Sequence, residues 1–92
     1  MGKTLNFNMG DRMGVKEAVV LRFQELCRLR EIRLNELATR SGVTPSTVYS
    51  MVSNRRHDIT MVTIKKLCDG LDISLSEFFD SPLFKNLEQE IQ

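Results

Sequence analysis

The feature that most constrains this chain is a connection of only three residues, centred on Gly42, between two stretches of helical character. A connection this short prevents the two helices from lying antiparallel, so they must cross steeply. Gly42 can adopt the left-handed conformation that ends the first helix. Thr44 can cap the free amides of the second helix, and Pro45 occupies its first position without losing a hydrogen bond. The sequence therefore predicts one helix over residues 34–40 and another from residue 45 to residue 52 or 53.

The steep crossing also sets requirements on the side chains of both helices. A small residue must lie where the helices touch, and Ala38 has the right position. Leu37 and Val43 near the turn, and Val48 and Met51 on the second helix, can anchor the pair to a core. The remaining face of the second helix has no acidic side chain to repel phosphate, and short hydroxyl side chains can approach base edges in a major groove. This face comprises Ser46, Thr47, Tyr49, Ser50 and Ser53.

Helical patterns also occupy most of the remaining chain, without lasting strand-like alternation. Residues 15–30 lack Gly and Pro, and Thr60 starts a further helix with one apolar stripe. Residues 74–77 form a capping box for a fifth helix, which Pro82 ends. The fold class is therefore all-α, a compact five-helix domain, with a short sixth helix in the tail left open. The apolar stripes comprise Val19, Phe23, Leu26 and Cys27; Met61, Ile64, Leu67, Cys68 and Leu71; and Phe84, Leu87 and Ile91.

Composition limits the classes of function. A chain of 92 residues with 41% hydrophobic residues is expected to form one soluble domain. Its longest aliphatic run, residues 18–21, is far too short to span a bilayer, and no apolar stretch follows Lys3 as in a signal peptide. We therefore expect a cytoplasmic protein without membrane contact, in which Cys27 and Cys68 are buried, reduced thiols. His57 is the only histidine, and no nucleophile–base pair or phosphate-binding Gly loop occurs, so we expect no metal, no cofactor and no enzyme activity.

Charge is distributed unevenly along the chain although the net charge is only +1. Residues 28–57 contain six arginines and two acidic residues, whereas residues 72–92 contain five acidic residues and one lysine. A basic middle and an acidic end favour a local surface for a polyanion. Scattered, solvated charges explain the same pattern equally well, so charge alone does not identify a polyanion as the ligand.

Four stretches of the chain resemble the Cro/phage-repressor family, also called the Xre-type helix-turn-helix proteins. They are residues 34–38 (LNELA), 41–48 (SGVTPSTV), 63–67 (TIKKL) and 71–79 (LDISLSEFF). Each stretch alone is a weak signal, but all four in this order, at the family's spacing over residues 20–80, form a strong one. The resemblance implies a five-helix, lambda-repressor-like DNA-binding domain whose third helix enters the major groove.

The resemblance also implies a function and a division of the chain. We expect a sequence-specific transcriptional regulator, a repressor, that binds a double-stranded DNA operator as a homodimer at least on DNA. Residues 1–13 are expected to form a flexible arm, residues 14–81 the helix-turn-helix domain, and residues 82–92 a tail with helical spacing. The positions that match base-reading residues are Pro45, Ser46 and Ser50, with Tyr49 adjacent. Those that match backbone-contacting residues are Thr44, Thr47, Ser53, Arg55 and Arg56. Leu34 stands where the family often has a phosphate-contacting glutamine, and we expect Arg33 or Asn35 to make that contact instead.

The chain departs from the family pattern at two further places, and the first of them predicts a structural contact. Many members pair an Arg late in the first helix with a Glu late in the third, inside the domain, and Cys27 and Val52 occupy these positions here. We expect both side chains to be buried and close together, as an apolar replacement for the ion pair. The Gly that is common between the first two helices is replaced by Glu31.

The tail and the function each leave an alternative open. Two apolar sets, at the start of the first helix and in the tail, have no assigned partner, and exposed apolar surface tends to be covered. We expect the two sets to contact one another, either within one chain or across a dimer, and a disordered tail is the remaining alternative. The alternative function is a protein-interaction module, such as an antitoxin or an anti-repressor partner, that uses the same fold to bind protein. The two sets are Val15, Val19 and Val20, and Phe84, Leu87 and Ile91.

Overall fold

The computed structural model of the chain describes residues 13–53 and 58–91. Within these residues the chain is all-helical, as predicted, and forms no strand. The predicted arm over residues 1–13 lies outside the described residues, apart from Met13. The elements are α1 (Val15–Arg30), α2 (Leu34–Arg40), α3 (Pro45–Val52), α4 (Met61–Leu71), α5 (Leu75–Phe79) and a 3-10 helix, η1 (Pro82–Phe84).

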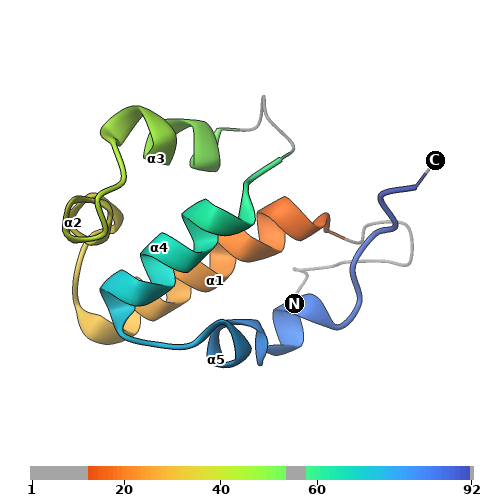
Figure 1. Cartoon of the computed structure of the whole chain (residues 1–92). Coiled ribbons are helices and arrows are strands. Elements are labelled where there is room, and N and C mark those ends of the chain that lie inside the picture. The colour runs from red at the N-terminus through yellow and green to blue at the C-terminus, as the bar shows by residue number, and fades with distance from the viewer. Residues whose placement is uncertain (1–12, 54–57, 92) are drawn as a thin grey trace, which may run out of the picture.

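The helices are arranged so that α3 lies at the outside of the molecule (Figure 1). α2 contacts α1, α3 and α4, and so joins α3 to the rest of the domain. α5 packs on α4, and η1 packs on α1, on the side of the molecule opposite α3 (Figure 1). The position of α3 therefore depends on how α2 docks against the two long helices.

The core is centred on two phenylalanines from distant parts of the chain. Phe23 of α1 and Phe78 of α5 are both 0% exposed, and their ring centroids lie 4.3 Å apart. Phe79 and Phe84 extend this aromatic cluster, with ring centroids 4.9 Å apart. Aromatic pairs at such separations contribute about 0.5–1.5 kcal/mol beyond their buried area. The aliphatic part of the core comprises Val19, Leu37, Val43, Val48, Met51, Ile64, Leu67 and Leu71.

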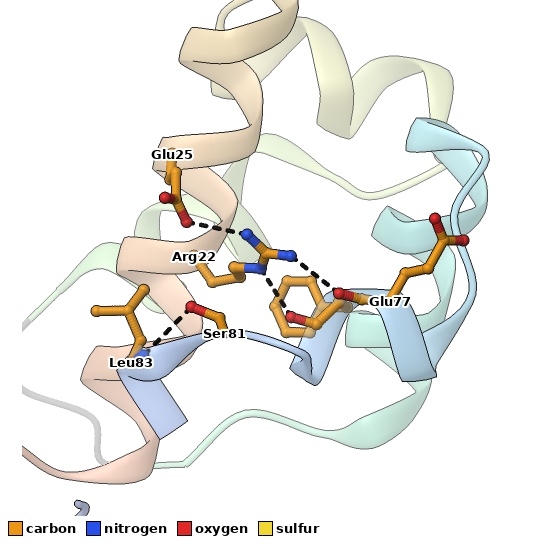
Figure 2. Close-up of polar contacts among 6 residues, drawn as sticks. Arg22, Glu25, Glu77, Ser81 and Leu83 are labelled. Atoms are coloured by element: carbon orange, nitrogen blue, oxygen red, sulfur yellow. Dashed lines mark hydrogen bonds and ion pairs between the residues drawn. The ribbon is translucent and has the colours of Figure 1, made fainter. Parts of the chain in front are cut away.

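Arg22 holds the C-terminal end of α5 against α1 (Figure 2). Its Nε donates to the carbonyl of Phe78 at 2.7 Å, and its Nη2 donates to the carbonyl of Glu77 at 2.9 Å. Its Nη1 forms an ion pair with Glu25 at 3.0 Å. The last carbonyls of a helix have no partner within that helix, so a guanidinium in this place satisfies acceptors that the helix cannot. Arg22 is therefore a structural residue, with only 14% of its side chain exposed.

Local signals place the helix ends where the sequence predicted them. Thr44 and Thr60 each accept a hydrogen bond from the amide three residues later, at 3.3 and 3.1 Å. Ser74 and Glu77 form both hydrogen bonds of the capping box. Gly42 has a φ of 72°, the left-handed conformation expected of the turn. Capping by short polar side chains therefore sets the starts of α3, α4 and α5.

Two side chains differ from the prediction. Val52 is 41% exposed although Cys27 is buried, so the expected buried pair between them is wrong. The buried side of α3 consists of Val48 and Met51, and one further residue turns the helix by about 100°, which carries Val52 out of the core. Met61, expected in the apolar stripe of α4, is 53% exposed, because it is the first residue of that helix and lies beyond its packed turns.

The tail forms one turn of 3-10 helix and continues without helix over residues 85–91. η1 packs on α1, and the amide of Glu88 donates to the carbonyl of Met13 at 3.0 Å. The tail therefore contacts the start of α1 within one chain, one of the two expected arrangements. Phe84 packs against the core, whereas Ile91 is 85% exposed. The expected contact is therefore made by the first part of the tail and not by its last apolar residue.

Both cysteines are buried free thiols, as predicted. Burial raises the pKa of Cys27 and raises the pKa of Cys68 to about 11, so both thiols stay protonated at neutral pH. No group of His, Cys, Asp and Glu side chains in the described part of the chain is arranged to hold a metal ion. Among residues 13–53 and 58–91, no helix has the length and apolar character needed to cross a bilayer.

Gly70 marks a close approach of α4 to the end of α2. A Cβ atom at Gly70 would lie 2.0 Å from the Oγ of Ser41 and 3.0 Å from the Cδ1 of Leu37. Overpacking of this kind costs about 1–3 kcal/mol, which outweighs the gain of up to ~1 kcal/mol from replacing a helical Gly by Ala. We therefore expect Gly70→Ala to lower the free energy of unfolding, measured by urea denaturation.

Removal of the Ser41 hydroxyl tests the cause of that loss. The Oγ of Ser41 is buried and has no hydrogen-bond partner among the described residues, so Ser41→Ala alone should not destabilise the domain. The double variant should recover only part of the stability lost in Gly70→Ala, because the Cβ of Ser41 would still lie 3.3 Å from the new methyl group. Strictly additive effects of the two substitutions would contradict the steric explanation.

Candidate nucleic-acid interface

The connection between α2 and α3 is held by backbone hydrogen bonds and by one buried side chain. The amides of Gly42 and Val43 donate to the carbonyls of Thr39 and Ala38, at 3.3 and 2.9 Å. Val43 is 8% exposed, and Ala38, the small residue expected at the helix crossing, is 2% exposed. These contacts close α2 and direct the chain steeply into α3, as the short connection predicted (Figure 1).

One face of α3 points to the core and the opposite face points outward. Val48 and Met51 are buried, which sets the rotation of the helix about its axis. Tyr49, on the outward side, is 75% exposed. The predicted base-reading positions therefore lie together on the accessible side of one helix. Besides Tyr49, this side carries Pro45 and Ser46, which are exposed, and Thr47 and Ser50, which are half-buried.

Three hydroxyl groups cluster at the N-terminal end of α3. The Oγ1 of Thr44 accepts the amide of Thr47 at 3.3 Å, and it also lies 3.0 Å from the Oγ1 of Thr47 and 3.3 Å from the Oγ of Ser46. This network satisfies one of the free amides of the first turn. The N-terminal end of a helix carries a partial positive charge, and α3 contains no charged side chain. The surface therefore favours an anion over a cation.

Two predicted backbone contacts lie at the start of α2. Arg33 is the N-cap of α2, and its side chain is exposed and makes no capping hydrogen bond. Asn35 is also exposed, and its carbonyl accepts the hydroxyl of Thr39 at 3.0 Å. Both side chains are therefore accessible to a ligand.

Two arginines of the basic segment also contact the end of α4. Arg30 donates to the carbonyl of Leu71, and Arg40 donates to the carbonyl of Gly70 at 3.4 Å. Cations in this position balance the partial negative charge at the C-terminal end of a helix. Arg30 and Arg40 therefore contribute to the structure as well as to the charge of the surface. The predicted phosphate contacts Arg55 and Arg56 lie outside the described residues.

Lys16 belongs to this region although nothing in the sequence pattern indicated it. It lies in the first turn of α1, and its Nζ donates to the carbonyl of Ser53, the C-cap of α3. The two residues are 37 positions apart, so no local signal links them. The contact connects α1 to the end of α3 and brings a cation next to Ser53, one of the predicted backbone contacts.

Comparisons with known proteins agree with this geometry. The sequence model of the Cro/C1-type HTH DNA-binding domain matches residues 22–82. A solved structure described as the crystal structure of the prophage Lp1 protein 11 is similar to this chain, with a TM-score of 0.74 and 33% sequence identity. That similarity covers 82% of this chain and 99% of the other. A search of curated proteins found no match.

The contact between Lys16 and Ser53 should stabilise the end of α3. Loss of one such hydrogen bond costs about 1 kcal/mol, so we expect Lys16→Met to speed amide hydrogen exchange in α3 several-fold. Lys66→Met, on the exposed surface of α4, removes the same charge and serves as the control. Equal exchange rates for α3 in the two variants would show that the Lys16 contact has no such role.

Proposed function

The chain belongs to the Cro/C1-type helix-turn-helix DNA-binding family, and we propose that it is a sequence-specific transcriptional repressor that places α3 in the major groove of an operator. The observation that carries this proposal is the outward face of α3, which is exposed, lacks acidic side chains and lies opposite a buried face. A major groove admits a helix with such a face. The proposed role requires no catalytic step.

Base contacts and backbone contacts are assigned to different parts of the motif. Base contacts give discrimination between sequences, whereas phosphate contacts give affinity without sequence information. The outward side chains of α3 are assigned to the bases, and the helix ends and flanking loops to the phosphates. The base-reading residues are Pro45, Ser46, Tyr49 and Ser50. The backbone-contacting residues are Arg33, Asn35, Thr44, Thr47, Ser53, Arg55 and Arg56.

The proposed complex contains two copies of the chain on one operator. A single recognition helix contacts only a few base pairs, and α3 has no Arg, Gln or Asn for strong bidentate contacts. A homodimer doubles the number of contacts and matches a two-fold operator whose half-sites lie about one helical turn apart. The weak base contacts of one helix are the reason for expecting a dimer at least on DNA.

Selection of bound sequences from a random duplex pool tests the proposed function. Enrichment of a two-fold symmetric sequence, bound well above random competitor, would support a dimeric regulator. Failure to bind any duplex at low salt, together with capture of a tight protein partner, would support a protein-interaction module instead. Sedimentation of the complex measures its stoichiometry, and one copy per enriched site would contradict the dimer.

Arg33→Ala and Tyr49→Ala should weaken binding in different ways, and both residues are exposed. Loss of the phosphate contact at Arg33 should lower specific and non-specific affinity alike and reduce the salt dependence by about one ion. Loss of Tyr49 should chiefly reduce the preference for the operator over random DNA, by about 1 kcal/mol, the low end of the range for base contacts, because Tyr49 cannot make a bidentate hydrogen bond. Affinities for both DNAs across a salt series separate the two effects. The reverse pattern would mean that the motif is oriented differently on DNA.

A further inference from the structure

α3 lacks the side chains that make strong hydrogen bonds to base edges. Residues 45–52 include no Arg, Lys, Asn, Gln, Asp or Glu. Such side chains supply most of the polar contacts by which proteins distinguish G, A and C in the major groove. Base recognition by α3 must therefore come from its hydroxyl groups or from its apolar surface.

The hydroxyl groups at the start of α3 are engaged within the helix itself. The Oγ1 of Thr44 accepts the amide of Thr47, and the hydroxyl groups of Ser46 and Thr47 lie 3.3 and 3.0 Å from the same oxygen. Each hydroxyl group has a single proton to donate, so a proton used in this network is withdrawn from a base. Ser50 is half-buried. Fewer hydroxyl protons of α3 are therefore free to be donated to bases than its composition suggests.

Two rings make up the apolar part of the outward face. Pro45 is exposed at the first position of α3, and Tyr49, one turn later, is 75% exposed. Residues four apart lie on the same side of a helix, so the two side chains form one stripe, and their Cα atoms are separated by about 6 Å along the helix axis. At 75% exposure, the ring of Tyr49 is accessible to a ligand.

We propose that Pro45 and Tyr49 recognise the 5-methyl groups of thymines in the major groove, an inference that rests on the proposed function. The thymine methyl is the apolar group that base edges present in this groove, and apolar side chains contact it. Because the two positions are about 6 Å apart along the helix axis, a helix that lies along the groove brings both rings to bases within about two steps of ~3.4 Å. Each half-site accordingly contains two thymines within about two base pairs of one another, with each methyl packed against one ring.

Replacement of thymine by uracil in the selected operator tests this inference, because uracil keeps the base pair and lacks only the methyl group. Burial of one methyl-sized group changes affinity about fourfold. We expect a loss of about fourfold at each contacted thymine and no change at thymines outside the half-sites. Equal affinity for the uracil and thymine operators, with preference over random DNA retained, would overturn the inference and leave the proposed function standing. The absence of any preferred duplex would overturn both.

Variants of Tyr49 identify which methyl group its ring contacts. Tyr49→Ser should abolish the uracil effect at one thymine of each half-site, whereas Tyr49→Phe should retain it because the phenyl ring keeps the apolar surface. Neither variant removes a core contact, so thermal unfolding should be unchanged in both. At the same position, 5-methylcytosine should bind more tightly than cytosine to the unsubstituted protein and equally to Tyr49→Ser. The same uracil effect in Tyr49→Ser and the unsubstituted protein would contradict the assignment.

Discussion

The packing of Phe78 against α1 is the contact on which the rest of the structure depends. Its ring is fully buried against Phe23 at 4.3 Å, and its carbonyl accepts the guanidinium of Arg22 at 2.7 Å, so one residue supplies both an apolar and a polar anchor. This pairing locks α5 onto α1 and completes the core between α1, α4 and α5. α3 has only eight residues, too few for a stable helix in isolation. Its form therefore depends on its packing against α2 and on Val48 and Met51, which belong to the same hydrophobic core as Phe23 and Phe78.

Several arginines of this fold donate hydrogen bonds to carbonyl groups at the C-terminal ends of helices. Arg22, Arg30 and Arg40 all donate to backbone carbonyls near the C-terminal ends of α5 and α4, from 56, 41 and 30 positions away in sequence. The last carbonyls of a helix have no partner within that helix, and a long cationic side chain satisfies them while balancing the helix dipole. Part of the uneven charge of the chain therefore has a structural role.

Local and long-range determinants explain which features the sequence could predict. The end of α2 and the start of α3 follow from Gly42, Thr44 and Pro45, because turn conformation and capping act over a few residues. The outward face of α3 followed from the spacing of its apolar residues. The close approach at Gly70 depends on how α4 packs against the end of α2, and no local pattern contains that arrangement. Val52 was assigned to the core from the position of the family's ion pair, whereas the helical period from Val48 and Met51 carries it outward. The contacts of Lys16 and of the arginines could not be predicted from the sequence either. Their partners are backbone carbonyl groups, which every residue possesses, in distant parts of the chain.

Side chains of the same chain form hydrogen bonds with backbone groups at both ends of α3, and these contacts hold the helix in place before a partner binds. Thr44 caps its first turn, and Lys16 donates to Ser53 at its last. A helix held in this way loses little conformational freedom when a partner binds, so less of the contact energy is spent on ordering it. The hydroxyl groups that could have contacted bases are used for this purpose at the N-terminal end. Rigidity and polar recognition therefore compete for the same short side chains in α3, and the exposed rings of Pro45 and Tyr49 are the groups that this competition leaves available.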